Sequence, residues 1–237
     1  MVSSKGKLRK FAEVENFENV LQPSFEEVFK KDFYLKGKWK TEFFKNSNPI
    51  TLELGCGKGE YTLGLAKLFP KRNFLGIDIK GARIWKGAKE ATEKEITNVG
   101  FIRSRIDFIT SFFERGEIDE IWITFPDPQL KKPLKRLTSS RFLGYYQNVI
   151  NSSAFIHLKT DSVELFHYTK ALADYNKLAV DAFIEDIYQS EHARDEVLSI
   201  KTFYEKGWLK EGLKSQYIRF KIDNEQQLNE PPEEESR

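Results

Sequence analysis

The sequence predicts a doubly wound α/β fold whose mostly parallel sheet carries an antiparallel strand at its edge. Short apolar runs alternate with amphipathic stretches from Ile50 onward, and a glycine cluster follows the first of these runs. The last two strand-like segments have no strong helix pattern between them. Strands separated by helix-length segments pair in parallel through right-handed crossovers, whereas the last two are expected to pair antiparallel.

The elements follow in order from local patterns of apolar residues and turn residues. Strands are expected over residues 50–54, 73–79, 100–106, 117–125, 154–161, 183–189 and 215–223. Helices are expected over residues 60–69, 82–95, 107–113, 138–151 and 162–177. These alternating elements form one domain over residues 49–222.

Two further segments flank this domain. Residues 1–48 mix bases and aromatic residues without a sustained period, and residues 46–49 (NSNP) break the chain, so they are expected to form a basic, partly disordered extension. Residues 223–237 hold six acids against one base and two adjacent prolines, which predicts an acidic, disordered tail.

Composition excludes several classes of protein. The apolar runs are too short to span a bilayer, and no apolar stretch follows the basic N-terminus, so no membrane association is expected. The single cysteine, Cys56, excludes an internal disulfide and a multi-cysteine zinc site, which favours a reducing, cytoplasmic location and no metal. The composition does not distinguish a monomer from a homodimer.

The charge pattern indicates a polyanionic partner. The net charge is +2, and removing the tail, whose own charge is −5, leaves 2 + 5 = +7. The remaining bases form clusters within residues 5–10, 30–40 and 131–141. Such clusters are typical of nucleic-acid binding, although solvated loops explain charge runs equally well.

A glycine cluster follows the first predicted strand and opens a predicted helix. Gly55, Gly57 and Gly59 give the spacing G-x-G-x-G, which matches neither the dinucleotide pattern G-x-G-x-x-G nor a phosphate-binding P-loop. Glycines let the backbone approach a ligand at the helix N-terminus. Asp78 ends the next strand, where a carboxylate can accept both hydroxyls of a ribose, and Glu53 is placed to hold a cationic amino group.

A second acid follows the fourth strand of the domain. Pro126 and Pro128 flank Asp127, stiffen the backbone and are expected to hold the carboxylate at the mouth of the cofactor cleft. A run of bases begins at Lys131, and a generic turn would explain Pro-Asp-Pro without explaining those bases. An acid among bases suits a reaction on a nucleobase that is carried by phosphates.

These motifs carry a family resemblance. The pattern E-x-G-x-G-x-G with the strand-end Asp resembles class I S-adenosylmethionine methyltransferases, which have a Rossmann-like fold. The segments LELGCGKGEY, GIDIKGARIWKGAKEA, FPDPQLKKPLKRL, IHLKTDSVELFHY and TFYEKGW resemble, in order, the motifs of the TrmB-type tRNA guanine-N7 methyltransferases. The resemblance implies S-adenosyl-L-methionine as cofactor, tRNA as partner and the guanine at tRNA position 46 as target.

The resemblance also implies roles for individual residues. The cofactor-binding residues would be Glu53, Gly55, Gly57, Gly59, Asp78, Arg105, Ile106 and Asp127, and Asp127 would also be the catalytic residue. The substrate guanine would meet Lys131, Asp161, Thr202, Phe203, Tyr204 and Glu205. This chain departs from the family at Gln129, where a Trp is usual, and at Arg105, where Asp or Asn is common near the adenine and where Asp107 is an alternative contact.

The predicted chemistry needs no base, because guanine N7 already carries a lone pair and positioning should dominate catalysis. Asp127, Asp161 and Glu205 could each hold the guanine edge or act electrostatically, and the sequence does not divide these roles. His157 and Cys56 have no partner at a catalytic spacing; His157 is expected to be a core or surface histidine, and Cys56 a small packing residue. Two alternatives stay open, a class I methyltransferase with another substrate and a non-catalytic RNA-binding subunit.

Overall fold

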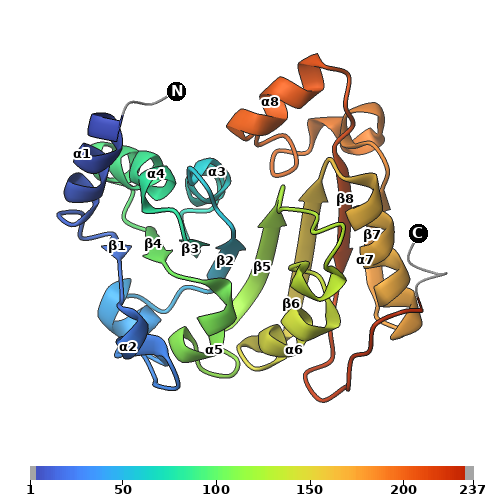
Figure 1. The fold of residues 1–237 in the computed structure, drawn as a ribbon, viewed down its shortest axis with the longest axis horizontal. Helices are drawn as coiled ribbons and strands as arrows, with labels where there is room; N and C mark the ends of the chain where they lie inside the picture. Colours follow the sequence, from blue (N-terminus) through green and yellow to red (C-terminus); the bar gives the residue numbers. More distant parts are fainter. Residues whose placement is uncertain (1–3, 233–237) are drawn as a thin grey trace. The chain divides into compact units, whose positions relative to one another are not determined.

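A computed structural model describes residues 4–232 of the chain (Figure 1). The chain forms two compact units, Met1–Phe113 and Glu114–Arg237. Each unit combines helices with parallel strand pairs, and the second also contains antiparallel pairs. The α/β fold class predicted from the sequence, mostly parallel with an antiparallel edge, is therefore confirmed.

The strands of the first unit are β1 (Val20–Leu21), β2 (Ile50–Leu54), β3 (Asn73–Asp78) and β4 (Val99–Arg103). They pair in parallel in the order β1-β4-β3-β2. β2 and β3 are buried along their whole length, as is usual for central parallel strands, and this burial includes the polar residues Thr51, Glu53 and Asp78. Leu54 is paired with Ile77, so the loop after β2 and the acid that ends β3 lie at the same edge of the sheet.

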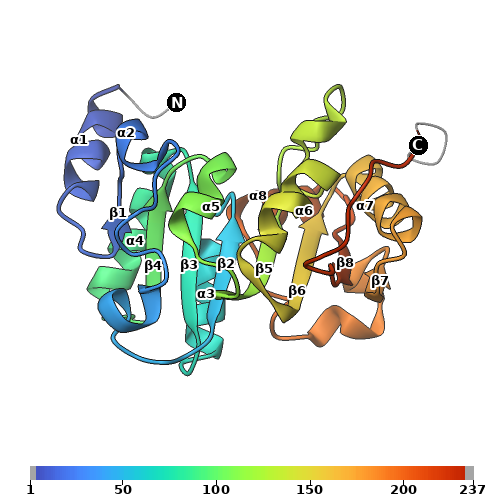
Figure 2. The ribbon, with the colours of Figure 1, turned by 90° about the horizontal axis from the view of Figure 1, so that it is seen from below.

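Helices cover both faces of these four strands. They are α1 (Ser4–Val14), α2 (Phe25–Val28), α3 (Glu60–Leu68), α4 (Gly81–Glu93) and α5 (Ile109–Phe112). α1, α3 and α4 lie on one face, and α2 and α5 lie on the other (Figures 1 and 2). The helix predicted over residues 107–113 is shorter than expected, since it consists of a 3-10 turn over Ile106–Phe108 and the single turn of α5.

The N-terminal region differs from the predicted extension within the described residues. β1 pairs with β4 at the edge of the sheet. A π-helical turn over Trp39–Phe43 buries the Trp39 indole, whose N–H donates to the Phe112 carbonyl at 2.8 Å. The aromatic residues of this region pack into the unit through contacts that are distant in sequence, so no local period reveals them. Residues 1–3 lie outside the described part of the chain.

The strands of the second unit are β5 (Ile118–Thr124), β6 (Ile150–Thr160), β7 (Val180–Ile184) and β8 (Gln216–Phe220). They pair in the order β5-β6-β8-β7, with β5 parallel to β6 and β8 antiparallel to both of its neighbours. The predicted antiparallel pair at the edge is thus confirmed. The strand predicted over residues 183–189 lies earlier, because residues 187–189 form a 3-10 turn.

The helices of the second unit are α6 (Ser140–Gln147), α7 (Val163–Tyr175) and α8 (Phe203–Lys210). α8 was not expected, since the sequence analysis placed no helix between the last two strands. Its N-terminus is a capping box in which the Thr202 hydroxyl accepts from the Glu205 amide and the Glu205 carboxylate accepts from the Thr202 amide. This T-x-x-E pattern is the local signal that predicts a helix start.

The acidic tail is irregular, but its described part is bound to the second unit. The Glu230 carboxylate accepts from the amide of Ser140, at the start of α6, at 2.8 Å and from the Tyr168 hydroxyl at 2.6 Å. Residues 223–232 therefore differ from the predicted disordered tail, and residues 233–237 lie outside the described part. Across residues 4–232, each helix is too short or too polar to cross a membrane.

Candidate active site

The glycine loop of the first unit joins β2 to α3 with three left-handed glycines. Gly55, Gly57 and Gly59 have φ values of 75°, 54° and 69°. A Cβ at Gly55 would meet no atom within 4 Å, and a Cβ at Gly57 would meet only the Gly55 carbonyl oxygen, at 3.9 Å. The surface of the loop at these two positions is therefore open to a ligand that approaches the backbone closely.

Gly59 has a different role from the other two glycines. A Cβ there would lie 2.6 Å from the Phe101 ring and 3.3 Å from the Gly87 Cα, so packing against β4 and α4 requires the missing side chain. All three glycines were predicted to bind the cofactor. The structure leaves open space at Gly55 and Gly57 and gives Gly59 a packing function.

Replacing Gly59 by alanine is expected to lower the free energy of unfolding by about 2–4 kcal/mol, because overpacking adds to the cost of a left-handed φ. Gly55→Ala is the matched control, with the same φ region but open space at Cβ, and it should cost only about 1–2 kcal/mol. Urea titration of both variants measures the difference. Equal losses would show that the Phe101 contact relaxes without cost.

Asp78 lies at the end of β3 and supports the glycine loop. One carboxylate oxygen accepts from the Gly57 amide at 2.9 Å, and the other accepts from the Lys80 amide at 2.7 Å. The residue is buried. A carboxylate has about four lone-pair positions, so two amide contacts leave capacity for the ribose hydroxyls that the sequence analysis assigned to it.

Glu53 is the buried acid at the other side of the loop. Its carboxylate accepts from the Thr62 amide at 2.8 Å and from the Thr62 hydroxyl, which ties β2 to the first turn of α3. Cys56, in the glycine loop, is also buried. Burial raises the pKa of its thiol well above the usual value, and the charges of Glu53 and Asp78 raise it further. A protonated thiol is a poor nucleophile, in agreement with the predicted core role.

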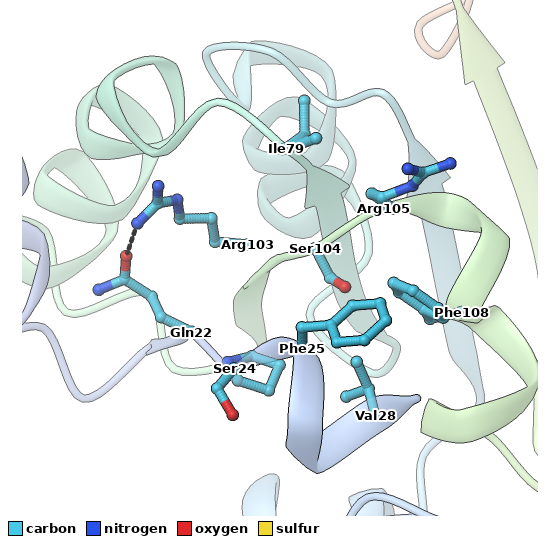
Figure 3. A pocket seen from close by; sticks show the side chains of 10 residues that line it. Gln22, Ser24, Phe25, Val28, Ile79, Arg103, Ser104, Arg105 and Phe108 are labelled. Atoms are coloured by element: carbon cyan, nitrogen blue, oxygen red, sulfur yellow. Dashed lines mark hydrogen bonds between the residues drawn. The ribbon is translucent and has the colours of Figure 1, made fainter. Parts of the chain in front are cut away.

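A cavity of about 400 Å³ opens beside the ends of β3 and β4 (Figure 3). It is lined by Gln22, Pro23, Ser24, Phe25, Val28, Ile79, Arg103, Ser104, Arg105 and Phe108. Figure 3 shows the Phe25 and Phe108 rings together on one side, and their centroids are 5.8 Å apart in an edge-to-face arrangement. The cavity therefore has an aromatic wall and polar strand ends, the composition of a small-molecule site.

Arg105, predicted near the adenine, lies at this cavity, while Ile106 does not line it. The guanidinium of Arg105 pairs with the Asp107 carboxylate at 3.2 Å. Arg105 and Asp107, which were predicted as alternative contacts to the adenine, therefore form an ion pair with each other. Ile79 and Phe108 also line the cavity but were not predicted; the signal for Ile79 was an apolar residue directly after the strand-end Asp78.

The Pro-Asp-Pro turn of the second unit follows β5. Phe125 has a left-handed φ of 47°, which is uncommon for a residue with a side chain, and its amide donates to the Lys159 carbonyl at 2.8 Å. Asp127 is exposed, and its carboxylate accepts from the Gln129 amide at 3.0 Å. The turn thus presents the Asp127 carboxylate to solvent in a fixed local geometry.

The bases after this turn divide into two groups. Lys131, Lys132 and Lys135 are exposed, as expected of phosphate contacts. Arg136 is buried, donates to the Pro128 carbonyl at 3.1 Å and lies 4.1 Å from the centre of the Tyr168 ring. It was expected to contact phosphate, but in this structure it holds the turn against α7.

Lys159 and Glu205 form a fully buried ion pair, each with 0% of its side chain exposed. The Lys159 ammonium, near the end of β6, contacts the Glu205 carboxylate at 2.8 Å and donates to the carbonyls of Leu198 and Ile200 at 2.8 and 3.0 Å. Burial lowers the pKa of Lys159, and the charge of Glu205 opposes that effect. The pair therefore attaches the start of α8 and the preceding loop to β6.

Glu205 was expected to meet the substrate guanine. Its carboxylate instead accepts from the Tyr188 hydroxyl at 2.7 Å and the Ser215 hydroxyl at 3.1 Å, in addition to Lys159 and the Thr202 amide. Because Glu205 has no exposed surface and these donors surround its carboxylate, it holds the start of α8 in place on the buried side of the helix. Lys159 was not predicted as part of the site. The signal that could have found it is its position inside the apolar strand segment IHLKT.

The other residues predicted to meet the substrate lie at the surface of the same region. Phe203 and Tyr204 are exposed at the start of α8, and Thr202 is its N-cap. Asp161 directly follows β6 and is half-buried. Burial raises the pKa of Asp161, and the charge of Glu205 raises it further. His157, for which both a core and a surface position were left open, is buried and stacks on Trp122 at 4.0 Å.

Sequence comparison finds relatives along nearly the whole chain. Residues 47–217 match the family described as "Putative methyltransferase". The chain is 49% identical over 227 residues to a tRNA (guanine-N(7)-)-methyltransferase of Bacteroides fragilis, covering 96% of this chain and 90% of the relative. It is 52% identical over 223 residues to the protein of the same description from Christiangramia forsetii, covering 93% of this chain and all of the relative.

Comparison with solved structures concerns the fold. An antibiotic-related methyltransferase is similar with a TM-score of 0.59 and 19% identity, covering 83% of this chain and 98% of the other. The 16S rRNA methyltransferase KamB is similar with a TM-score of 0.59 and 14% identity, covering 79% and 92% of the two chains. At these identities the likeness indicates a shared methyltransferase architecture.

Proposed function

Since the chain belongs to the tRNA (guanine-N7-)-methyltransferase family, we propose that its target is the guanine at position 46, in the variable loop of tRNA. The methyl donor is S-adenosyl-L-methionine. The observation that supports this site is the pair of left-handed glycines with open Cβ positions beside the Asp78 carboxylate. A tRNA substrate and a single cysteine, which cannot form an internal disulfide, are in keeping with a cytoplasmic enzyme.

The first unit would hold the cofactor. The backbone of Gly55 and Gly57 would receive its amino-acid portion, with Glu53 opposite the cationic amino group and Asp78 accepting from the ribose hydroxyls. The cavity beside Arg105 is apolar on its aromatic side, which suits an adenine ring. The bound cofactor supplies an electrophilic methyl group on a sulfonium centre.

The second unit would hold the guanine. The N7 lone pair forms the new bond to carbon as the carbon–sulfur bond breaks, so the purine gains a positive charge and S-adenosyl-L-homocysteine leaves. Asp127, with its exposed carboxylate, would stabilise that charge or accept from the N1–H and N2–H edge. Asp161 would share this edge, and neither acid needs to remove a proton before transfer.

The direct test uses radiolabelled methyl donor, unmodified tRNA and nucleoside analysis of the product. We expect 7-methylguanosine, and we expect it to be lost when guanine 46 of the tRNA is replaced. A labelled product at another base would overturn the target and leave a class I methyltransferase. Calorimetry with the donor alone separates the non-catalytic alternative, because an RNA-binding subunit without a cofactor site would release no heat.

The exposed lysines after the Pro-Asp-Pro turn are expected to neutralise tRNA phosphates. Replacing Lys131, Lys132 and Lys135 together by alanine should make tRNA binding less dependent on salt. The slope of log K against log[salt] should become smaller in magnitude by about 2–3, because each phosphate contact contributes about 1. Filter binding between 50 and 200 mM salt measures the slope. Lys170→Ala, on α7, is the control, and an equal change there would refute a specific role.

A further inference from the structure

The described part of the acidic tail lies along α6 and α7 and is held there by specific hydrogen bonds (Figure 2). The Gln147 side-chain amide, at the end of α6, donates to the Gln226 carbonyl at 2.7 Å. The Asn176 side chain, directly after α7, donates to the Asn229 carbonyl at 2.8 Å and accepts from the Asn229 amide at 2.8 Å. These bonds fix the tail up to the residue before Glu230.

Glu230 contacts both helices through one carboxylate. It accepts from the Ser140 amide, in the first turn of α6, at 2.8 Å and from the Tyr168 hydroxyl of α7 at 2.6 Å. Burial raises the pKa of Tyr168, and the hydrogen bond to Glu230 raises it further. The hydroxyl therefore keeps its proton and remains a donor to the tail.

The Tyr168 ring supports a buried cation next to the Pro-Asp-Pro turn. The Arg136 guanidinium lies 4.1 Å from the centre of this ring and is 6% exposed. Its Nε donates to the Pro128 carbonyl at 3.1 Å. A ring face and a carbonyl acceptor replace the water that a buried guanidinium loses. Contacts therefore continue from Glu230 through Tyr168 and Arg136 to the residue that follows Asp127.

The turn needs such support because its backbone is strained. Phe125 and Gln129, on either side of Pro-Asp-Pro, have left-handed φ values of 47° and 46°. Residues with side chains adopt this region at a cost, and they remain in it where surrounding contacts determine the conformation. The hydrogen bond from Arg136 to the Pro128 carbonyl is such a contact, since this carbonyl belongs to the peptide group that enters Gln129.

The same peptide group also contacts the Asp127 carboxylate. Its carbonyl, from Pro128, accepts from Arg136, and its N–H, from Gln129, donates to Asp127 at 3.0 Å. A peptide group is a rigid plane, so a contact that fixes the carbonyl also fixes the direction of the N–H. Arg136 therefore determines how the N–H meets the carboxylate of Asp127.

We propose that Glu230 is a positioning residue for methyl transfer, which acts through Tyr168 and Arg136 to hold the Asp127 carboxylate in the orientation that transfer requires. This inference rests on the proposed function, in which Asp127 acts on the guanine, and adds to it a requirement for the C-terminal tail. Glu230 itself touches neither the tRNA nor the methyl donor.

The test measures kcat and KM for Glu230→Ala, with donor and tRNA affinities measured separately. We expect kcat to fall about 10- to 100-fold, because a small displacement of a positioned group can cost about 100-fold in rate, while both affinities stay nearly unchanged. Tyr168→Phe keeps the ring beside Arg136 and loses only the hydroxyl, so it should show a loss of similar size. The double variant should lose no more than the larger single loss, because both changes break the same series of contacts.

Two control variants belong to this test. Glu225→Ala is the matched control, because this acid of the same tail pairs with Arg115 at the surface and should leave kcat unchanged. Glu230→Gln retains an acceptor oxygen for the Tyr168 hydroxyl and should recover part of kcat. Kinetics are recorded at a temperature at which circular dichroism shows the variants folded, and Tyr168→Phe carries the same comparison if Glu230→Ala does not fold.

A second cycle separates positioning of Asp127 from a general loss of structure. In the Asp127→Ala background, Glu230→Ala should lower kcat no further, since the carboxylate that it positions is absent. A further loss as large as that in the unchanged protein would overturn the inference, because Glu230 would then act only on the packing of α6 and α7.

The inference would also be overturned if kcat of both Glu230→Ala and Tyr168→Phe stayed within about twofold of the unchanged protein. Formation of 7-methylguanosine by the unchanged protein in the same assay separates this failure from that of the proposed function. If the product forms, only the role of Glu230 fails, whereas absence of the product would refute the proposed function itself.

Discussion

Replacing Asp127 by alanine should lower kcat for methyl transfer by about 10²–10³-fold, the effect of removing one preorganised electrostatic contact to the transition state. The residue is exposed, and its carboxylate contacts the Gln129 amide locally, so the fold should persist. The affinity for tRNA should change little, because the phosphate contacts lie on other residues. Single-turnover transfer and filter binding measure the two quantities separately.

Asp127→Asn is the informative companion variant. Its side-chain oxygen can still accept from the Gln129 amide, so the turn is retained while the charge is removed. A large loss of kcat in both variants would assign the effect to the charge, and a loss confined to alanine would assign it to the geometry of the turn. Near-normal transfer by Asp127→Ala would refute the catalytic role.

Breaking the buried ion pair should have the largest effect on stability. Lys159→Met leaves the Glu205 carboxylate in a site with no exposed surface, and loss of one partner of a buried pair costs about 3–5 kcal/mol. Chemical unfolding monitored by circular dichroism measures this loss. The exposed pair of Lys170 and Asp174 supplies the control, since Lys170→Met should cost about 0.5 kcal/mol or less.

The double variant Lys159→Met, Glu205→Leu separates a positioning role of Glu205 from direct contact with guanine. Removing both charges should recover most of the lost stability, because apolar replacements of a buried pair are often well tolerated. If Glu205 only positions α8, the recovered variant should also regain kcat/KM for tRNA. Restored stability without restored transfer would show that the carboxylate itself contacts the substrate.

The sequence predicted those parts of the site that local pattern determines. Gly55 and Gly57 follow one predicted strand and Asp78 ends the next, and parallel pairing of these strands brings the loop and the acid to one edge. Asp127 was likewise predicted from its flanking prolines. The glycine loop, Asp78 and Asp127 depend on residues that are close in the chain or on adjacent strands. The spacing of residues in the sequence therefore predicts their positions.

The remainder depends on contacts between distant segments. The Trp39 indole bonds to the Phe112 carbonyl, and the cavity beside Arg105 is closed by residues 22–28. No period in the sequence relates such positions. The buried position of Glu205 could not be predicted either, because the T-x-x-E spacing fits both the helix cap that the structure shows and the substrate contact that the family resemblance implies. Only the burial of the Glu205 side chain, seen in the structure, distinguishes these two roles.

Lys159 holds two separate segments through different atoms. Its backbone carbonyl accepts from the Phe125 amide, and its side chain holds the start of α8. The Pro-Asp-Pro turn and the start of α8 are therefore both attached to the same residue at the end of β6. Attempts to redirect the enzyme to another nucleoside should redesign the solvent-facing side chains of both segments and retain lysine at position 159.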